Sequence, residues 1–370
     1  MTKLEQLIEE HCPNGVEIRS LEKCCQVLDN KRKPITKSAR EAGEYPYYGA
    51  NGIQDYVADY IFDGTYVLVG EDGSVMTPNG TPVVNWAEGK IWVNNHAHII
   101  AEIDDVLLRY LFHYLQIVDV KPLIHGNIPK LTGGDFKALK IPVPPLPVQS
   151  EIVKILDNFT ELTAELTAEL TARKKQYEYY ASSLFAFDEN VKWVKLDEIA
   201  EIGTGSSNTN EGLEEGKYPF FVRSQEPLRK NEYEYDETAI ITAGDGVGVG
   251  KVFHYVEGKY ALHQRAYRIH VNTPNVLPKY YFYYMRATFL PYIQKTMFQG
   301  SVASIRRPML NAFPVPVPPI EEQERIVSIL DRFDALCGDI SSGLPAEIAA
   351  RQKQYEYYRD KLLTFKERIA

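Results

Sequence analysis

Long apolar runs are missing from this 370-residue chain. No apolar stretch reaches the roughly 18 residues of a transmembrane helix, and the N-terminal MTKLEQLIEEHC has neither an apolar signal core nor a basic leader. Cysteine is scarce, and the adjacent Cys24 and Cys25, with Cys12 and Cys337 apart from them, lack the spacing of a metal site or a disulfide framework. The sequence therefore predicts no membrane span and no metal site, in a reducing, cytoplasmic setting.

Positive charge is also in deficit. Lys and Arg number 41 against 50 Asp and Glu, which gives a net charge of −9, whereas a domain that binds nucleic acid by overall charge is basic. The charge is unevenly distributed, because acids are dense in two similar segments and basic clusters such as Lys31-Arg32-Lys33 and Arg306-Arg307 lie between them. A solvated surface is the ordinary explanation of each cluster, and contacts to phosphates are the alternative.

Familiar catalytic motifs are absent too. The run Gly244–Lys251 resembles a nucleotide-binding loop, but Asp245 stands where a Walker loop has glycine, and Val252 where it has Ser or Thr. A glycine-rich methyl-donor loop is missing, as is the Asn/Asp-Pro-Pro-Tyr/Phe tetrapeptide of amino-methyltransferases. His96 and His98 share one face of a predicted strand without a third zinc ligand nearby. The chain is therefore predicted to be a binding protein with no catalytic residue.

One acidic pattern leaves an enzymatic alternative open. An acid followed by Glu-x-Lys is the spacing of metal-dependent nucleases, in which two carboxylates hold magnesium and a lysine steadies the attacking water. Glu-Gly-Lys is also an ordinary turn before a strand, and the turn is the favoured interpretation. The alternative is a site-specific nuclease with two sets of residues: Asp72, Glu88 and Lys90, and Asp245, Glu257 and Lys259.

What the chain does contain is a long internal repeat. The segment IPVPPLPVQSEIVKILDNF, which begins at Ile141, returns as FPVPVPPIEEQERIVSILDRF from Phe313, and the motif QYEYY begins at Gln176 and again at Gln354. Solenoid repeats are roughly 20–50 residues long, and this period is far longer. The chain thus carries the same two-part unit twice, and its ligand is expected to have two similar halves.

Each copy of the repeat predicts a stiff proline strap followed by a long helix. Proline fixes φ and is excluded from helix interiors and central strands, so Pro142–Pro147 and Pro314–Pro319 are predicted to be extended. Apolar residues then recur at spacings of three and four, the pattern of a helix that packs on another long helix. These spacer residues are Ile152, Ile155, Phe159, Leu162, Leu166, Tyr177 and Tyr180 in the first copy, and Ile326, Ile329, Phe333, Leu336, Tyr355 and Tyr358 in the second. Antiparallel pairing of the two helices is the economical topology, since a whole domain separates them.

The two copies differ in the middle of the helix. The first has the Thr-Ala-Glu-Leu tetrads Thr163–Leu166 and Thr167–Leu170. Adding or removing a tetrad changes the helix length by about 6 Å with a rotation of about 40°. Repeat slippage in a tolerant surface helix is the plain alternative. The second copy has glycine and serine there, and we predict a break near Gly343 and a restart with Pro345 in the first turn.

The regions between the repeats correspond in their framework and differ in their loops. Tyr45–Tyr48 matches Tyr218–Phe221, and Tyr66–Gly73 matches Ala239–Gly246. These blocks alternate β-branched and aromatic strands with Gly and Asn turns. The predicted fold class is α+β, with two similar globular domains separated by two long helices that pair as an antiparallel coiled coil with pseudo-two-fold symmetry. The predicted domains are 1–145 (first globular domain), 146–187 (central spacer helix), 188–318 (second globular domain) and 319–370 (C-terminal spacer helix).

The duplicated strap-and-helix segments and the QYEYY motifs resemble those of the specificity subunits of type I restriction–modification systems, and the resemblance covers essentially the whole chain. It implies two target-recognition domains, each reading one half of a bipartite, asymmetric DNA site, and helices that set the unread gap. The implied partners are double-stranded DNA, two modification (methyltransferase) subunits and restriction/translocase subunits. The chain itself is expected to be non-catalytic and without cofactor, with S-adenosylmethionine, ATP and magnesium used by the partner subunits.

Polar residues in the dissimilar loops are the candidate base readers. Arginine suits guanine, and asparagine or glutamine suits adenine. For each of them, a turn former or a surface charge is the plain alternative. The candidate readers are Asn51, Asn94, Asn95 and Lys130 in the first domain, and Arg223, Gln225, Gln264, Arg265, Arg306 and Arg307 in the second.

Overall fold

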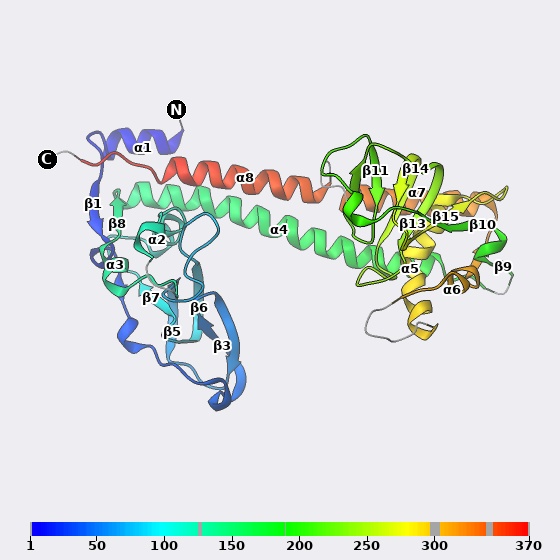
Figure 1. Ribbon diagram of the computed structural model, residues 1–370. Helices are drawn as coiled ribbons and strands as arrows, with labels where there is room; N and C mark the ends of the chain where they lie inside the picture. The colour runs from blue at the N-terminus through cyan, green and yellow to red at the C-terminus, as the bar shows by residue number, and fades with distance from the viewer. Residues whose placement is uncertain (1, 125–127, 189, 297–303, 338–342, 369–370) are drawn as a thin grey trace. The chain divides into compact units, whose positions relative to one another are not determined.

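The computed structural model describes residues 2–124, 128–188, 190–296, 304–337 and 343–368 (Figure 1). The chain divides into two compact units. Unit 1 consists of Met1–Glu165 and Ile348–Ala370, and unit 2 consists of Leu166–Glu347. Each unit therefore contains the beginning of one repeated segment and the end of the other.

Unit 1 is built on a six-stranded sheet with the order β2-β7-β5-β6-β3-β4. Neighbouring strands are antiparallel except β3 and β6, which are parallel. Valine and isoleucine recur in the central strands, because β-branched side chains fit a pleated surface that is buried on both faces. The strands are β2 (Gln26–Val27), β3 (Ala42–Gly49), β4 (Gly52–Val57), β5 (Phe62–Gly70), β6 (Val84–Val93) and β7 (Ala97–Ala101).

Helices and a second, two-stranded sheet complete unit 1. In this small sheet β1 (Glu17–Ser20) pairs antiparallel with β8 (Lys140–Val143), so part of the first proline strap becomes a strand. Proline is tolerated there because both strands of a two-stranded sheet are edges. The main core lies between the sheet and the helices and contains Val67, Val69 and Tyr110. The helices are α1 (Lys3–His11), α2 (Leu108–Leu115) and α3 (Gly133–Ala138), with 3-10 helices η1 (Leu21–Lys23), η2 (Asp29–Lys31), η3 (Lys37–Ala39) and η4 (Lys121–Leu123).

Unit 2 repeats this architecture. Its six-stranded sheet has the order β10-β15-β13-β14-β11-β12, in which β11 and β14 are the parallel pair. The strands therefore correspond one to one with those of unit 1, which confirms the two similar domains predicted from the sequence. They are β10 (Ala200–Thr204), β11 (Tyr218–Phe221), β12 (Leu228–Lys230), β13 (Tyr235–Ala243), β14 (Phe253–Leu262) and β15 (Ala266–Val271).

The remaining elements of unit 2 also have counterparts in unit 1. The strand β9 (Lys192–Lys195) pairs antiparallel with β16 (Pro314–Val317), as β1 does with β8. The long helix of this unit's globular part is α5 (Pro278–Thr296), which is rich in aromatic residues, and Tyr280 and Phe289 on it are fully buried in the core of unit 2. The other short helices are α6 (Arg307–Asn311), η5 (Leu196–Glu198) and η6 (Thr209–Glu211).

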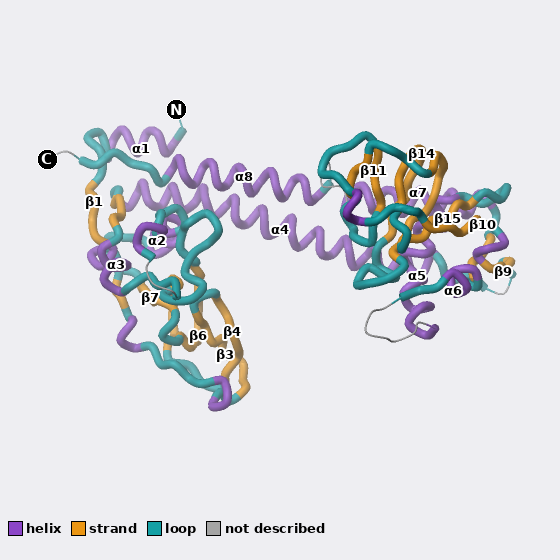
Figure 2. The backbone as a smooth tube through the Cα atoms, in the orientation of Figure 1, coloured by secondary structure: helices purple, strands orange, loops and turns teal. Residues whose placement is uncertain are grey.

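The repeated segments form the long helices shown in Figure 2. The first copy is one helix, α4 (Leu146–Leu184), unbroken through the tetrads. The second copy is two helices, α7 (Ile320–Cys337) and α8 (Leu344–Leu362), and Pro345 lies in the first turn of α8 as predicted. The predicted break near Gly343 adjoins residues 338–342, which lie outside the described residues. No helix in the described ranges combines the length and apolarity needed to cross a membrane.

Within each unit the two helix segments run antiparallel. In unit 1, α4 starts directly after β8, and beyond the end of α8 the C=O of Lys366 accepts a hydrogen bond from the N–H of Val16 at the start of β1. Since β1 pairs with β8, the start of α4 and the end of α8 lie at the same place. In unit 2, α7 starts after β16, and β9, the partner of β16, follows the end of α4.

Aromatic contacts join the paired helices. In unit 1 Phe159 stacks on Tyr358 with ring centroids 5.4 Å apart. In unit 2 Phe333 contacts both Tyr177 and Tyr180, each at 6.0 Å. The other predicted spacer residues differ in exposure. Ile152 and Ile326 are fully buried and Tyr355 nearly so, Ile155, Leu166 and Ile329 are half-buried, and Leu162 and Leu336 are exposed.

Candidate nucleic-acid interface

In unit 1, two of the candidate readers lie in the turn between β6 and β7. Asn94, Asn95 and His96 form this turn. The N–H of Asn94 donates to the C=O of Tyr48 (3.0 Å), and the Asn94 Oδ1 accepts from the N–H of His96 (2.8 Å). The Asn94 side chain is therefore buried and engaged within the turn, whereas Asn95 and His96 are exposed.

Unit 2 has the same turn between β14 and β15. Here His263 N–H donates to the C=O of Phe221 (2.9 Å), and His263 Nδ1 accepts from the N–H of Arg265 (2.9 Å). Burial, aided by the charge of Arg223, lowers the pKa of His263. A neutral ring leaves Nδ1 able to accept this hydrogen bond. Gln264 and Arg265 are exposed, so the buried–exposed–exposed pattern of the unit 1 turn is repeated.

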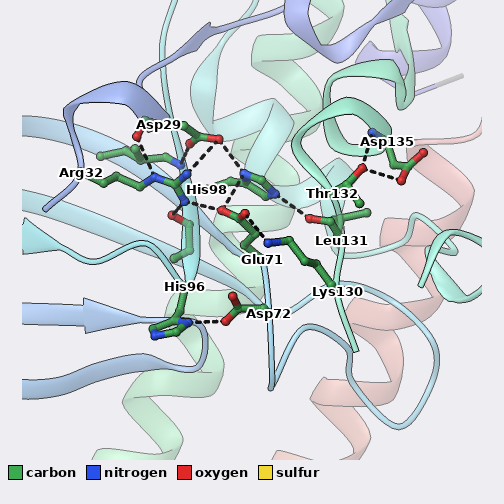
Figure 3. A network of polar contacts seen from close by, with 12 residues as sticks. Asp29, Arg32, Glu71, Asp72, His96, His98, Lys130, Leu131, Thr132 and Asp135 are labelled. Carbon is green, nitrogen blue, oxygen red and sulfur yellow. Dashed lines mark hydrogen bonds and ion pairs between the residues drawn. The ribbon is translucent and has the colours of Figure 1, made fainter. Parts of the chain in front are cut away.

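A network of charged side chains lies beside the unit 1 turn (Figure 3). His98 Nδ1 lies 2.7 Å from Asp29, Arg32 donates to Glu71 at 2.6 Å, and Lys130 lies 3.2 Å from the other oxygen of Glu71. Burial raises the pKa of Asp29, but the hydrogen bond and charge of His98 and the charge of Arg32 outweigh it, so the pKa is lowered. The network ties the segments around Asp29 and Lys130 to the central strands.

Part of this network has the composition of a metal site. Asp29, Glu71 and His98 place ligand atoms within 4.8 Å of one another, the one such group in the described part of the chain. However, Arg32 already contacts both carboxylates. His98 Nδ1 lies 2.7 Å from Asp29 and Nε2 lies 3.0 Å from the C=O of Leu131, so both ring nitrogens already contact protein groups. The group is an ion-pair network.

An outer aspartate faces the third turn residue in both units. In unit 1 Asp72 pairs with His96 Nδ1, as Figure 3 shows. In unit 2 Asp245 accepts from Arg223 (2.7 Å) and from Arg265 (3.0 Å). Burial raises the pKa of Asp245, yet the hydrogen bonds from the two arginines prevail and lower it. Asp245 is therefore held as a carboxylate that orients two arginines.

The other candidate readers lie on neighbouring loops. Asn51 is exposed in the turn between β3 and β4, and Gln225 is exposed in the loop between β11 and β12, which is its topological counterpart. Arg306 and Arg307 are exposed at the start of α6. The N–H of Ile305 donates to the C=O of Gly244 (2.9 Å), which places Arg306 near the outer aspartate. The readers of unit 2 thus gather at one end of its sheet.

The structure separates the residues of the nuclease alternative in unit 1. Glu88 pairs with Thr65 within the β5–β6 ladder, whereas Asp72 lies beyond the end of β5. At about 3.3 Å per residue, Thr65 and Asp72 are on the order of 20 Å apart along the strand. Lys90 lies 4.6 Å from the centre of the Tyr60 ring. A magnesium site built on these residues is excluded by this separation.

The same separation occurs in unit 2. Glu257 pairs with Thr238, Asp245 lies beyond β13, and Lys259 lies 4.6 Å from the centre of the Tyr233 ring. The prediction that Glu-Gly-Lys forms a turn before a strand is wrong in both units, because the tripeptides lie inside β6 and β14. Their glycines have φ values of 77° and 89°, in the left-handed region, yet both strands keep an unshifted ladder through them.

The sequence did not identify His96 as a reader or Asp72 and Asp245 as its supports. In the sequence alone, the pattern around His96 suggests zinc and that around the aspartates suggests magnesium. The signal was present in the matching blocks Tyr66–Gly73 and Ala239–Gly246, which place an aspartate at the same distance from the end of each central strand. Only the strand register shows that the turn after β6 or β14 lies beside this aspartate.

Comparison with known proteins is consistent with this geometry. Residues 13–173 and 188–350 each match the type I restriction modification DNA specificity domain. A protein of Haemophilus influenzae named as a type I restriction enzyme specificity subunit is 35% identical, with 98% of each chain covered. The EcoR124I/EcoR124II specificity subunit of Escherichia coli is 37% identical over 72% of this chain and 74% of its own.

Solved structures show the same fold. The S subunit of a type I restriction–modification system from M. genitalium has a TM-score of 0.63 at 17% identity, covering 94% of this chain and 96% of its own. A chain from a structure of type I complex assembly has a TM-score of 0.59 at 15% identity, covering 95% and 98%. Two matched domains and a full-length relative lead to one conclusion: the chain belongs to the family of type I restriction–modification DNA specificity subunits.

Proposed function

We propose that this chain directs a type I modification and restriction complex to a bipartite, asymmetric DNA site, with each unit reading one half-site. As a member of its family, the chain is a DNA specificity subunit and is non-catalytic. The observation that carries the proposal is the pairing of a shared framework with dissimilar exposed side chains. The turns Asn94–His96 and His263–Arg265 have the same hydrogen bonds but offer different groups to a ligand. Two such units suit two unlike half-sites.

The paired helices are proposed to set the gap between the half-sites. The helix α4 is continuous from unit 1 into unit 2 and contains the tetrads Thr163–Leu166 and Thr167–Leu170. One tetrad adds about 6 Å of helix, and successive base pairs lie about 3.4 Å apart. One tetrad would therefore change the gap by one to two base pairs.

The same helices are proposed to bind the protein partners, which are two modification subunits and the restriction/translocase subunits. Leu162, Tyr180, Leu336 and Tyr358 expose apolar surface on helices that are otherwise rich in acid. Acidic residues keep this surface away from DNA and leave it available to a protein. S-adenosylmethionine, ATP and magnesium are assigned to the partner subunits, as is methylation of adenine.

The test is to express the chain with its modification subunit and to map methylated bases across the host genome. The proposal predicts one split motif, with two defined half-sites separated by a fixed stretch of unspecified bases. A control strain that expresses the modification subunit alone should show no such motif. A contiguous motif, or no motif with both subunits present, would contradict the proposal.

A further inference from the structure

The turns between β6 and β7 and between β14 and β15 are held in the same backbone frame. The N–H of Glu71 donates to the C=O of His96, and the N–H of Gly244 donates to the C=O of Arg265, both at 2.8 Å. The strand registers agree, because Gly70 pairs with Ala97 in unit 1, and Ala243 pairs with Ala266 in unit 2. His96 and Arg265 therefore occupy equivalent positions on rigid elements.

In both units the residue that follows the donor of this hydrogen bond is an aspartate. Asp72 follows Glu71 and faces His96, whereas Asp245 follows Gly244 and faces Arg265. A carboxylate held just beyond the end of a strand limits the rotamers of the side chain that it binds, so the outward-facing edge of that side chain is pre-organised. The support is constant while the supported side chain differs, as expected where a common framework carries a specific contact.

In unit 2 the supported side chain presents a free edge. Arg265 uses Nη1 for Asp245, and its Nε and Nη2 have no partner among the residues that the structure describes. The side chain is 63% exposed. Two parallel N–H groups on one edge of a guanidinium match the N7 and O6 acceptors of guanine in the major groove.

In unit 1 the corresponding side chain offers a single atom. His96 faces Asp72 with Nδ1, which therefore carries a hydrogen, because a carboxylate only accepts. Its Nε2 has no partner within the described ranges, and the side chain is 48% exposed. A ring of this tautomer contacts one base atom, in contrast to the two-atom contact of an arginine.

From this geometry we infer that the third residue of the turn determines the base read at one position of each half-site. Arg265 contacts a guanine in the half-site of unit 2, and His96 contacts one base in the half-site of unit 1. Asp245 and Asp72 are positioning residues that act through them. The inference rests on the proposed function, in which each unit reads one half-site.

The experiment compares the genomic methylation motifs of variants expressed with the modification subunit. Arg265→Ala should leave the unit 1 half-site unchanged. In the unit 2 half-site, one position that is guanine in the unaltered motif should become unspecified. Affinity of the complex for the guanine-containing duplex should fall by about 5- to 150-fold, the range expected for one bidentate contact. His96→Ala should remove the base preference at one position of the unit 1 half-site. His96→Arg should change the preference at that position to guanine, since Asp72 remains to orient the new side chain.

Lys259→Ala is the matched control, because it also removes one exposed positive charge but lies on β14 away from the turn. It should keep the complete motif. An unchanged motif in Arg265→Ala would overturn the inference, and so would an affinity loss equal for every sequence, since that is the behaviour of a phosphate contact. These results leave the split motif of the unaltered chain in place, whereas absence of that motif would refute the proposed function itself.

Discussion

Gln149 and Gln323 hold the same place in the two units, and each joins the start of a long helix to two other backbone segments. The Oε1 of Gln149 accepts from the N–H of Leu107 (2.9 Å), and its Nε2 donates to the carbonyls of Pro144 (2.7 Å) and Asp105 (3.1 Å). Gln323 makes the three equivalent hydrogen bonds at 2.8, 2.8 and 3.1 Å. Both side chains are fully buried.

Replacing this glutamine should be costly. Gln149→Leu keeps the approximate volume but leaves one N–H and two carbonyl groups without this partner in the protein interior, and each such group costs about 1–3 kcal/mol. We expect the free energy of unfolding to fall by about 3–5 kcal/mol in urea denaturation. Gln354→Leu, an exposed change of the same chemistry, should cost under about 0.5 kcal/mol. Equal losses in the two variants would show that the buried hydrogen bonds contribute little.

Acidification should weaken unit 1 through His113. This side chain is fully buried between Asp157 (2.8 Å) and Tyr355 (3.1 Å), and burial lowers its pKa below the ordinary 6.5, although Asp157 opposes the shift. The unfolded chain then binds this proton more readily than the folded protein does. Stability must fall as the pH drops below about 6.5, by at most about 1.4 kcal/mol per pH unit for one proton.

His113→Gln isolates this effect. The variant keeps a donor toward Asp157 but does not titrate, while every other histidine is retained. Unfolding free energies measured from pH 7 to pH 5 should decline less steeply for the variant than for the unaltered chain. Parallel curves would exclude His113 as a source of the pH dependence.

The four cysteines should differ in reactivity. Burial raises the pKa of Cys24 to about 11 and of Cys25 to about 12, and it also raises the pKa of Cys12, so few thiolates form at pH 8. Burial raises the pKa of Cys337 too, but this side chain is less buried than the other three. Iodoacetamide at pH 8 should therefore modify Cys337 first, and the others at rates set by unfolding. Peptide mass mapping that finds Cys24 or Cys25 labelled as fast as Cys337 would contradict the packing described for unit 1.

The helix segments should respond to truncation according to burial. Leu156 in unit 1 and Leu330 in unit 2 are both fully buried, with 0% of their surface exposed. Leu162, on the same helix as Leu156, is 45% exposed. Leu156→Ala and Leu330→Ala should each cost about 2–5 kcal/mol. The same truncation at Leu162 should cost under about 1 kcal/mol, because little apolar area is lost. Thermal unfolding of the three variants tests this order.

The architecture was largely predictable because its signals are local and repeated. Spacing of three and four placed Ile152 and Ile326 on helix faces, and both are buried. Proline marked the straps, and the duplicated motif indicated two similar domains. Antiparallel pairing followed from connectivity, and it explains why each unit combines the start of one repeat with the end of the other.

The candidate site was predictable only in part, because loops of unequal length hide which residues are equivalent. Asn94 is a predicted DNA contact, and its buried amide bonds His96 within the turn and Gln54 on β4. His96 and Arg265 have no sequence similarity, and only the strand register shows that they correspond. The strand positions of Gly89 and Gly258 are hidden for a similar reason, since a left-handed glycine inside a ladder has the sequence of a turn.

In the proposed function, unlike units read the two half-sites and the helices set the distance between them. The most direct test changes the number of tetrads and maps the methylated motif. Deletion of Thr163–Leu166 should shorten the gap by one to two base pairs, and insertion of one more Thr-Ala-Glu-Leu should lengthen it by the same amount, since each tetrad is about 6 Å of helix. Both half-sites should remain unchanged. An altered half-site, or an unchanged gap in an active complex, would contradict the account.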